Sequence, residues 1–266
     1  MRALNGDVLR TFNLFNFEAG FNNAALVVSD QNTFPGIDVA RFGENINTIA
    51  DRATFEGTSV IEQIDGACTM FERYYGVETI EGARRTTHYS IPYEAFREAV
   101  ANAVAHRTWD VNAKIRIAMH PNRIEISSPG GLPAGLGRDE YLRGFISQLR
   151  NPILANVLFR LNIIEMFGTG IVRIRSSYAE YEQKPEFDVS ENAVRVTLPV
   201  TDARPALTSD EELVYRFVKE EGPTASGQIV ANFNFGKDKA VKLLRSLVEK
   251  RYVEKTGTGR GTKYRA

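Results

Sequence analysis

Glu98, Asn102 and His106 are three polar residues that recur every four positions in an alanine-rich segment, residues 97–107. Residues four apart lie on the same side of an α-helix, and no glycine or proline interrupts this one. A carboxylate, an amide and an imidazole on one side of a helix would suit a ligand pocket. A stripe of solvent-exposed side chains on a surface helix would explain the same pattern, so this segment alone favours neither interpretation.

The composition indicates a chain large enough for two domains. It has 266 residues, 43% of them hydrophobic, with 33 basic and 33 acidic side chains, so net charge by itself indicates no partner. Cys68 is the single cysteine, which excludes an internal disulfide and a cysteine-rich zinc site and fits a reducing cytosol. No apolar stretch reaches the roughly 20 residues of a membrane helix, so we expect a soluble, cytoplasmic protein with no membrane partner.

The segments before the helix are predicted from their local patterns. Residues 1–24 show no long period and form an N-terminal extension. Residues 25–28 and 37–42 are rich in strand-forming side chains and flank a Pro-Gly turn. Residues 58–74 repeat apolar side chains at helical spacing, and residues 86–90 are again β-prone. The helix that carries Glu98 therefore follows a short strand.

Two glycine-containing turns follow the helix. Residues 113–119 and 123–127 alternate apolar and polar side chains, which predicts a hairpin with one buried face. It runs into Ser128-Pro129-Gly130-Gly131, where glycines let backbone atoms approach another group closely, although the cluster taken alone favours a plain irregular loop. Gly168-Thr169-Gly170 opens a helix over residues 171–181. Free amides and the positive end of a helix dipole suit an anion or phosphate.

The remaining patterns divide the chain in two. A helical region over residues 138–167 and two closing strands complete a first domain, residues 1–200, that mixes a largely antiparallel sheet with helices. Residues 201–207 form a linker. Residues 208–266 predict three helices and a glycine-tipped hairpin, beginning with a capping box at Thr208. This is the pattern of a winged helix-turn-helix.

Basic side chains are concentrated at the C-terminus. Residues 236–266 hold ten basic and three acidic side chains, a net charge of +7 in a chain whose total is zero. The start of the last helix and the tip of the wing are where such a domain contacts DNA phosphates. The alternative is a winged helix that contacts another protein, whose lysines are merely exposed to solvent. The candidate contacts to double-stranded DNA are Lys237, Lys239, Lys242, Arg245, Arg260 and Lys263.

Three motifs in this order resemble a divergent GHKL-type (Bergerat-fold) ATPase domain. They are Glu98 with Asn102, the Ser128-Pro129-Gly130-Gly131 loop after a hairpin, and Gly168-Thr169-Gly170 before a helix. The resemblance implies an α+β fold: a Bergerat-like α/β two-layer sandwich with a largely antiparallel mixed sheet, followed here by the winged helix-turn-helix.

A narrower resemblance, over roughly residues 20–200, is to one bacterial family labelled transcriptional regulators or RecG-like in their C-terminal part. It is carried by residues 95–107, 123–133, 150–152 and 167–171. Members usually begin with an AlbA/Schlafen-type DNA-binding domain, which this sequence lacks, so we expect the chain to be the C-terminal portion of a longer protein. The helicase part of the label finds no support, because no Gly-x4-Gly-Lys-Ser/Thr loop occurs.

The resemblance also implies roles for individual residues. Glu98 would polarise the attacking water and Asn102 would hold Mg²⁺. The family's adenine-binding aspartate is replaced by Ser128 and its second loop glycine by Leu132. Losing one charge-assisted hydrogen bond would cost roughly 1.5–3 kcal/mol, which lowers the expected adenine selectivity. The candidate nucleotide-site residues are Glu98, Asn102, His106, Ser128, Gly130, Gly131, Gly168, Thr169 and Gly170.

Three functions follow as alternatives. The first is a DNA-binding regulator whose ATP–Mg²⁺ site communicates with the winged helix, at most a slow ATPase and expected to be a homodimer. The second is a nucleotide-free scaffold for dimerisation and DNA contact, which the replacements at Ser128 and Leu132 motivate. A metabolic enzyme is the weakest alternative, because no nucleophile pair, metal-ligand cluster or dinucleotide fingerprint occurs.

Overall fold

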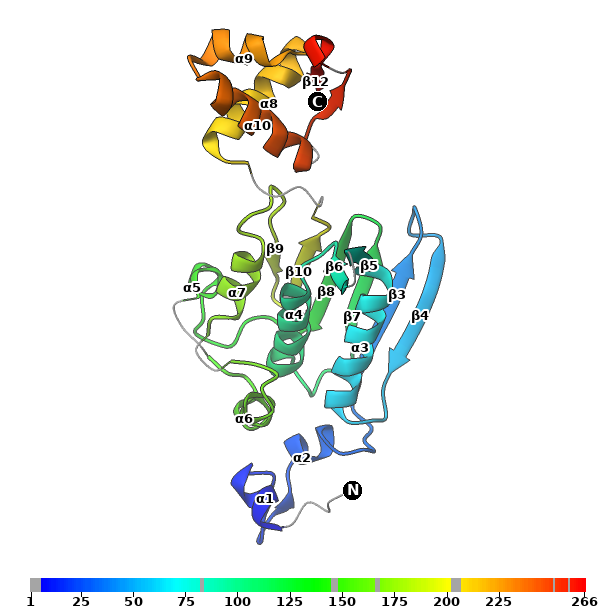
Figure 1. The fold of residues 1–266 in the computed structure, drawn as a ribbon. Helices are drawn as coiled ribbons and strands as arrows, with labels where there is room; N and C mark the ends of the chain where they lie inside the picture. Colours follow the sequence, from blue (N-terminus) through cyan, green and yellow to red (C-terminus); the bar gives the residue numbers. More distant parts are fainter. Residues whose placement is uncertain are drawn as a thin grey trace. The chain divides into compact units, whose positions relative to one another are not determined.

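The computed structural model of the chain has two compact units (Figure 1). The first comprises Met1–Ala179 and Gln183–Val200, and the second comprises Glu180–Glu182 and Thr201–Ala266. No helix among the described residues is both long and apolar enough to cross a membrane. The structure describes residues 6–81, 84–144, 148–165, 168–201, 207–250, 252–257 and 259–266.

A six-stranded sheet forms the centre of the first unit, in the order β4-β3-β7-β8-β10-β9. Neighbouring strands are antiparallel except β3 and β7, which are parallel, so the sheet is mixed and largely antiparallel. The strands are β3 (Ile37–Phe42), β4 (Ile49–Phe55), β7 (Ile115–His120), β8 (Arg123–Pro129), β9 (Glu186–Val189) and β10 (Ala193–Pro199).

The hairpin of β7 and β8 illustrates why this sheet has one buried face. Successive side chains of a strand point to opposite faces, and the inward side chains of Ile117, Met119 and Ile126 are at most 1% exposed. Polar side chains such as Arg116 take the alternate positions and remain exposed. His120 pairs with Arg123 across a two-residue turn, so the predicted hairpin is confirmed.

Helices cover the buried face. Helices α3 (Val60–Tyr75), α4 (Tyr93–His106) and α7 (Gly170–Ser177) lie on the same side of the sheet (Figure 1). The rings of Phe71 on α3 and Phe96 on α4 stack with 4.3 Å between centroids. One layer of helices on one sheet is a two-layer α/β sandwich, and the predicted α+β fold class is confirmed.

Residues 25–28 were predicted as a strand, but residues 25–27 belong to the helix α2 (Asn23–Val27) and Val28 is its C-cap. The side chain of Asn22 accepts a hydrogen bond from the amide of Ala25 at 3.0 Å. This N-cap satisfies a backbone donor locally, and it outweighs the strand preference of a short apolar run. The N-terminal extension also contains α1 (Gly6–Thr11) and a small hairpin of β1 (Phe15–Asn16) and β2 (Gly20–Phe21).

Three further predicted elements have different bounds. The helical region over residues 138–167 contains two helices, α5 (Arg138–Arg143) and α6 (Pro152–Arg160), and Gly144 ends α5 with a left-handed φ of 68°. Glycine adopts this conformation without strain. The helix predicted over residues 171–181 ends at Ser177, and residues 86–90 fall mostly in β6 (Arg84–Tyr89), which pairs with β5 (Gly76–Glu81).

The described residues of the second unit form three α-helices, a short 3-10 helix and a two-stranded hairpin. Thr208 caps α8 and forms a capping box with Glu211, as the sequence predicts. Val214, Leu244 and Leu247 are fully buried at the centre of the unit. Tyr264 forms a β-bridge with Thr224, which ties the hairpin to the segment before α9. The elements are α8 (Ser209–Glu221), α9 (Ser226–Phe233), α10 (Lys237–Glu249), β11 (Glu254–Thr256) and β12 (Lys263–Arg265).

Candidate functional site

The helix α4 presents the Glu98 and Asn102 side chains as a bonded pair. Glu98 is 4% exposed, and its Oε1 accepts a hydrogen bond from Asn102 Nδ2 at 2.9 Å. A carboxylate only accepts, so the amide nitrogen must face it. The oxygen of the Asn102 amide is therefore directed away from Glu98 and remains available to another partner.

A cavity of about 100 Å³ lies between α4, the end of β8, α5 and α7. Asn102 and His106 line it from α4, and Ser128 lines it from β8. Glu98 and Thr169, which the sequence also predicts at the site, are not among the lining residues. The other predicted residues that line this cavity are Gly130, Gly131, Gly168 and Gly170.

The cavity walls include residues that the sequence did not single out. Ile126, Val194 and Val196 form an apolar floor on β8 and β10, while Tyr141 and Gln148 add polar groups. Burial raises the pKa of Tyr141 to about 12, so its hydroxyl keeps its proton near neutral pH. No local sequence pattern could have indicated these residues, because they come from distant segments that meet only through tertiary packing.

Ser128 bonds to the helix that it faces. It is 7% exposed, and its hydroxyl donates a hydrogen bond to the Ala103 carbonyl of α4 at 2.9 Å. A hydroxyl has one proton to donate, so only the oxygen lone pairs remain for another partner. Towards a ligand in the cavity, Ser128 is therefore an acceptor.

The loop glycines Gly130 and Gly131 are required by packing within the chain. Gly130 has a φ of 96°, and a Cβ added there would lie 1.9 Å from Thr108 Oγ1. A Cβ on Gly131 would lie 2.3 Å from the Glu191 carbonyl oxygen. The amide of Gly130 donates to the Asn192 carbonyl at 2.9 Å. The close approach that these glycines permit is to the chain itself, and the loop thereby forms one side of the cavity.

Gly170 packs directly on the polar pair of α4. An added Cβ would lie 2.5 Å from Asn102 Nδ2 and 2.8 Å from Glu98 Oε1. Gly168, two residues earlier, has a left-handed φ of 68°. The first backbone bond into this helix comes from Arg173 to the Thr169 carbonyl, so the preceding amides have no acceptor within the helix. The positive end of the α7 dipole thus lies beside Glu98 and Asn102.

Arg150 and Asn151 act as a clamp between α4, the glycine loop and α6. Arg150 donates to the Gly131 carbonyl at 2.7 Å and also to Thr108 Oγ1. Asn151 Nδ2 donates to the carbonyls of Ala105 and Arg107, at 2.9 and 2.8 Å. These are carbonyls at the end of α4, where the helix leaves acceptors without intrahelical donors. The motif at residues 150–152 therefore has a structural role, because its first two side chains hold the segments around the cavity in place.

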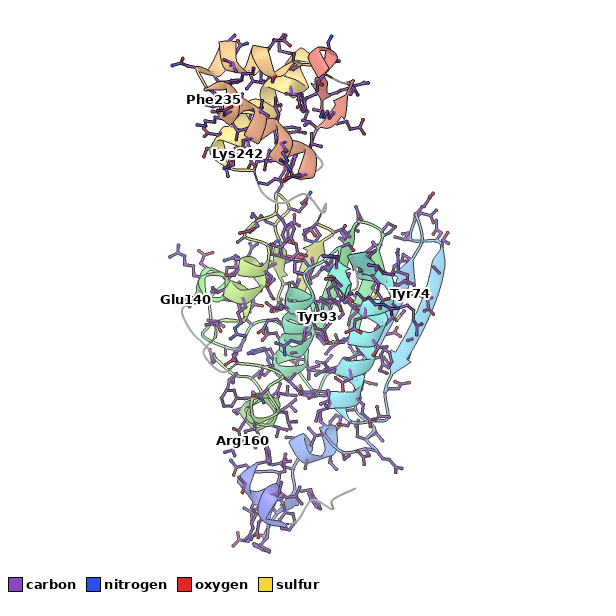
Figure 2. All side chains as sticks on the ribbon, viewed as in Figure 1. Tyr74, Tyr93, Glu140, Arg160, Phe235 and Lys242 are labelled. Atoms are coloured by element: carbon purple, nitrogen blue, oxygen red, sulfur yellow. The ribbon has the colours of Figure 1, made fainter. Side chains whose placement is uncertain are left out.

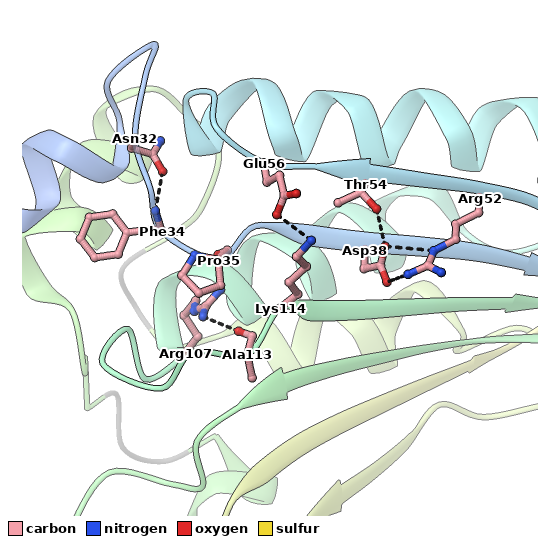
Figure 3. A network of polar contacts seen from close by, with 10 residues as sticks. All are labelled: Asn32, Phe34, Pro35, Asp38, Arg52, Thr54, Glu56, Arg107, Ala113 and Lys114. Carbon is pink, nitrogen blue, oxygen red and sulfur yellow. Dashed lines mark hydrogen bonds and ion pairs between the residues drawn. The ribbon is translucent and has the colours of Figure 1, made fainter.

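His106 and Arg107 have different surroundings at the end of α4. Burial, together with the nearby Arg150, lowers the pKa of His106, so the imidazole that lines the cavity is neutral at neutral pH. Arg107 is fully buried and donates to the Pro35 and Ala113 carbonyls at 2.7 and 2.6 Å (Figure 3). Its guanidinium also lies over the Trp109 ring. Burial lowers its pKa to about 10.

The candidate DNA-contact residues of the second unit differ in their surroundings, because some are simply exposed and others form ion pairs. Lys237 and Lys242 are exposed on α10 (Lys242 is labelled in Figure 2), and Lys263 is exposed on β12. Lys239 instead pairs with Asp210 at 2.7 Å, and Arg245 pairs with Glu249 at 2.9 Å. Arg260 belongs to the short 3-10 helix Gly259–Gly261, and its side chain lies outside the described residues.

Comparisons with known proteins bear on the first unit. Residues 112–198 match a family model described as "Putative ATP-dependent DNA helicase recG C-terminal". This match supports an ATPase-type domain. It implies nucleotide binding in general terms, and the matched segment includes Ser128, Gly168 and Gly170 of the cavity. It begins after α4, so Glu98, Asn102 and His106 lie outside it.

A solved structure shares the fold at low identity. The DIP2311 protein from Corynebacterium diphtheriae superimposes with a TM-score of 0.64 and is 20% identical, over 92% of this chain and 54% of that one. At this identity the likeness shows the fold alone. The chain spans about half the length of that protein. No curated protein matches the chain.

Proposed function

We propose that the first unit binds ATP with Mg²⁺ in the cavity beside α4, and that the second unit is a winged helix that binds double-stranded DNA. The chain would then be a DNA-binding regulator that responds to a nucleotide. The observation that carries the nucleotide half is that Asn102, Ser128 and Gly170 meet at one cavity although they are far apart in sequence.

The residues at the cavity suit the parts of such a ligand. Ser128 would accept from an amino group on the base, and the apolar floor of Ile126 and Val196 would contact the ring. The amides at Gly170 and the α7 dipole would stabilise phosphates, each favourable contact contributing about 0.3–1 kcal/mol. The Asn102 oxygen would bind Mg²⁺, whose remaining ligands would be phosphates and water. No cluster of three acidic, histidine or cysteine side chains in the described residues offers an alternative metal site.

The size of the cavity supports a second candidate, a nucleotide-free scaffold. Its volume of about 100 Å³ is below the roughly 300–1,000 Å³ of most small-molecule sites. ATP binding therefore requires the cavity to widen. Under the scaffold alternative the cavity stays closed, and DNA contact through the second unit is the only activity.

Isothermal titration with ATP separates the two candidates. We expect saturable heat that requires Mg²⁺ and a weaker signal with GTP, whose base presents a carbonyl where adenine presents an amino group. Absence of heat at millimolar ATP with correctly folded protein would support the scaffold. Phosphate release should be slow or absent, because we propose at most a slow ATPase and no helicase.

The DNA half rests on charge and shape in the second unit. A net charge of +7 falls on residues 236–266, and Lys237 and Lys242 are exposed at the start and middle of α10. Their ammonium groups would neutralise DNA phosphates and release counterions. Fluorescence anisotropy against duplex DNA at two salt concentrations tests this, and binding that ignores salt would contradict it. We also propose a cytoplasmic homodimer, which light scattering of the purified chain tests for its oligomeric part.

A further inference from the structure

The outer face of α10 carries a valine among charged side chains. Four residues of this helix are exposed at intervals of three and four positions, which places them on one side. On the other side, Leu244 and Leu247 are fully buried in the core of the second unit, and Leu243 and Val248 pack against that core. Val241, in contrast, is 41% exposed. The exposed four are Asp238, Val241, Lys242 and Arg245.

The charged members of this face have roles that need no contact with a base. Asp238 lies in the first turn of α10, where the helix dipole favours a carboxylate. Lys242 and Arg245 have long cationic side chains, which suit DNA phosphates. Val241 has no charge, and valine is a poorer helix former than alanine, lysine or arginine. Neither helix stability nor phosphate contact therefore accounts for a valine at this position.

The position of Val241 on α10 suits contact with base pairs. In a helix-turn-helix the recognition helix lies in the major groove, and its N-terminal residues contact base edges. Val241 is the fifth residue of α10. At 3.6 residues per turn, Lys237 and Lys242 fall on either side of it around the helix axis. If these two lysines bind phosphates along the edges of the groove, the side chain between them is directed at the bases.

Base edges in the major groove offer a valine one distinctive partner. Most of the groups displayed there are hydrogen-bond donors and acceptors, whereas thymine adds a 5-methyl group that apolar side chains contact. Valine is branched at Cβ, so its χ1 angle is nearly fixed in a helix and its methyl groups keep one direction.

We infer that Val241 contacts the 5-methyl group of a thymine, and that the second unit thereby selects thymine at one position of its duplex site. The inference rests on the proposed DNA-binding role of the second unit. Lys237 and Lys242 would bind phosphates of any sequence, and Val241 would supply specificity.

Replacing single methyl groups of the DNA tests this contact. The full chain first selects its preferred duplexes from a randomised library. Each thymine of the selected site is then replaced in turn by deoxyuridine, which lacks only the methyl group. At one position the affinity of the wild type should fall about fourfold, the value of one buried methyl group. In Val241→Ala the same replacement should change the affinity by less than about twofold, because the contact has already been lost.

Leu213→Ala is the matched control, because Leu213 is an apolar residue of α8 that is 47% exposed. It should keep the fourfold loss of the wild type. Val241→Ala should fold normally, since its site is exposed and alanine favours a helix. Equal affinity for thymine and deoxyuridine at every position in the wild type would overturn the inference, as would a loss in Val241→Ala equal to that of the wild type.

The selection itself separates this inference from the proposed function. Duplexes that bind without a shared sequence would overturn the role of Val241 and leave DNA binding in place. If no duplex binds at low salt, the proposed DNA-binding function fails, and the role of Val241 fails with it.

Discussion

Replacing Gly170 with alanine should both destabilise the first unit and block the proposed nucleotide site. The new Cβ would lie 2.5 Å from Asn102 Nδ2 and 2.8 Å from Glu98 Oε1, so at least one of these groups must move. Overpacking of this kind costs about 1–3 kcal/mol, and alanine regains about 0.4–1 kcal/mol by restricting the unfolded chain. With the middle value of each range, about 2 and about 0.7 kcal/mol, the net loss is about 1.3 kcal/mol, which corresponds to a decrease of about 3–5 °C in melting temperature for a domain of this size.

Thermal melts with and without Mg²⁺–ATP measure both effects. A ligand at 100 times its Kd stabilises the folded state by about 2.7 kcal/mol, which should raise the melting temperature of the wild type and not that of Gly170→Ala. Gly6→Ala is the matched control, because a Cβ there meets nothing within 4 Å. If Gly170→Ala melts like the wild type and keeps the full ligand-dependent shift, then α7 does not pack on Asn102 as described here for the folded chain.

Three further perturbations test other parts of the chain. Asn151→Asp should melt below Asn151→Ala, because its carboxylate would face the two carbonyls that the amide now satisfies; an equal or higher melting temperature would contradict the clamp. Burial alone would raise the pKa of Glu211, but hydrogen bonds, the first from Lys250, outweigh it and hold the pKa at about 2. Because the folded pKa is depressed, this stabilisation of about 3 kcal/mol is present above pH 4.5 and is lost as the pH falls towards 2. Hydrogen exchange of the α10 amides at pH 6 and pH 3, corrected for intrinsic exchange rates, should show lower protection at pH 3. Protection that is unchanged after this correction would contradict the role of Glu211. Lys242→Ala with Arg245→Ala should weaken duplex binding and reduce its salt slope by about 1.8, whereas Arg216→Ala on α8 should leave both unchanged; an unaltered slope in the double variant would place the DNA contacts elsewhere.

The sequence was most informative where a pattern follows from local geometry. The alternation in residues 113–127 predicted the central hairpin, because a strand that buries one face must alternate. The spacing of Glu98 and Asn102 predicted that both would project from one side of α4, and the structure places their side chains 2.9 Å apart. The capping box at Thr208 marked the start of α8 in the same way.

The sequence was least informative where the neighbours come from distant segments. Gly130 and Gly131 suggested an approach to a ligand, but their nearest contacts are Thr108 and the turn before β10. Arg107 ends a helix as basic residues often do, and nothing in its local pattern indicates complete burial under the segment that contains Pro35. Residues 25–27 are helical because the side chain of Asn22 caps the start of α2, and their strand-forming composition gave no indication of this cap.

We propose that the cavity beside α4 binds a nucleotide, and a crystal structure of the chain grown with Mg²⁺ and a non-hydrolysable ATP analogue tests this proposal. We expect the base beside Ser128, the phosphates at Gly168–Gly170 and the metal ion on the Asn102 oxygen. A cavity that stays closed at saturating analogue, or an analogue bound elsewhere on the chain, would contradict it.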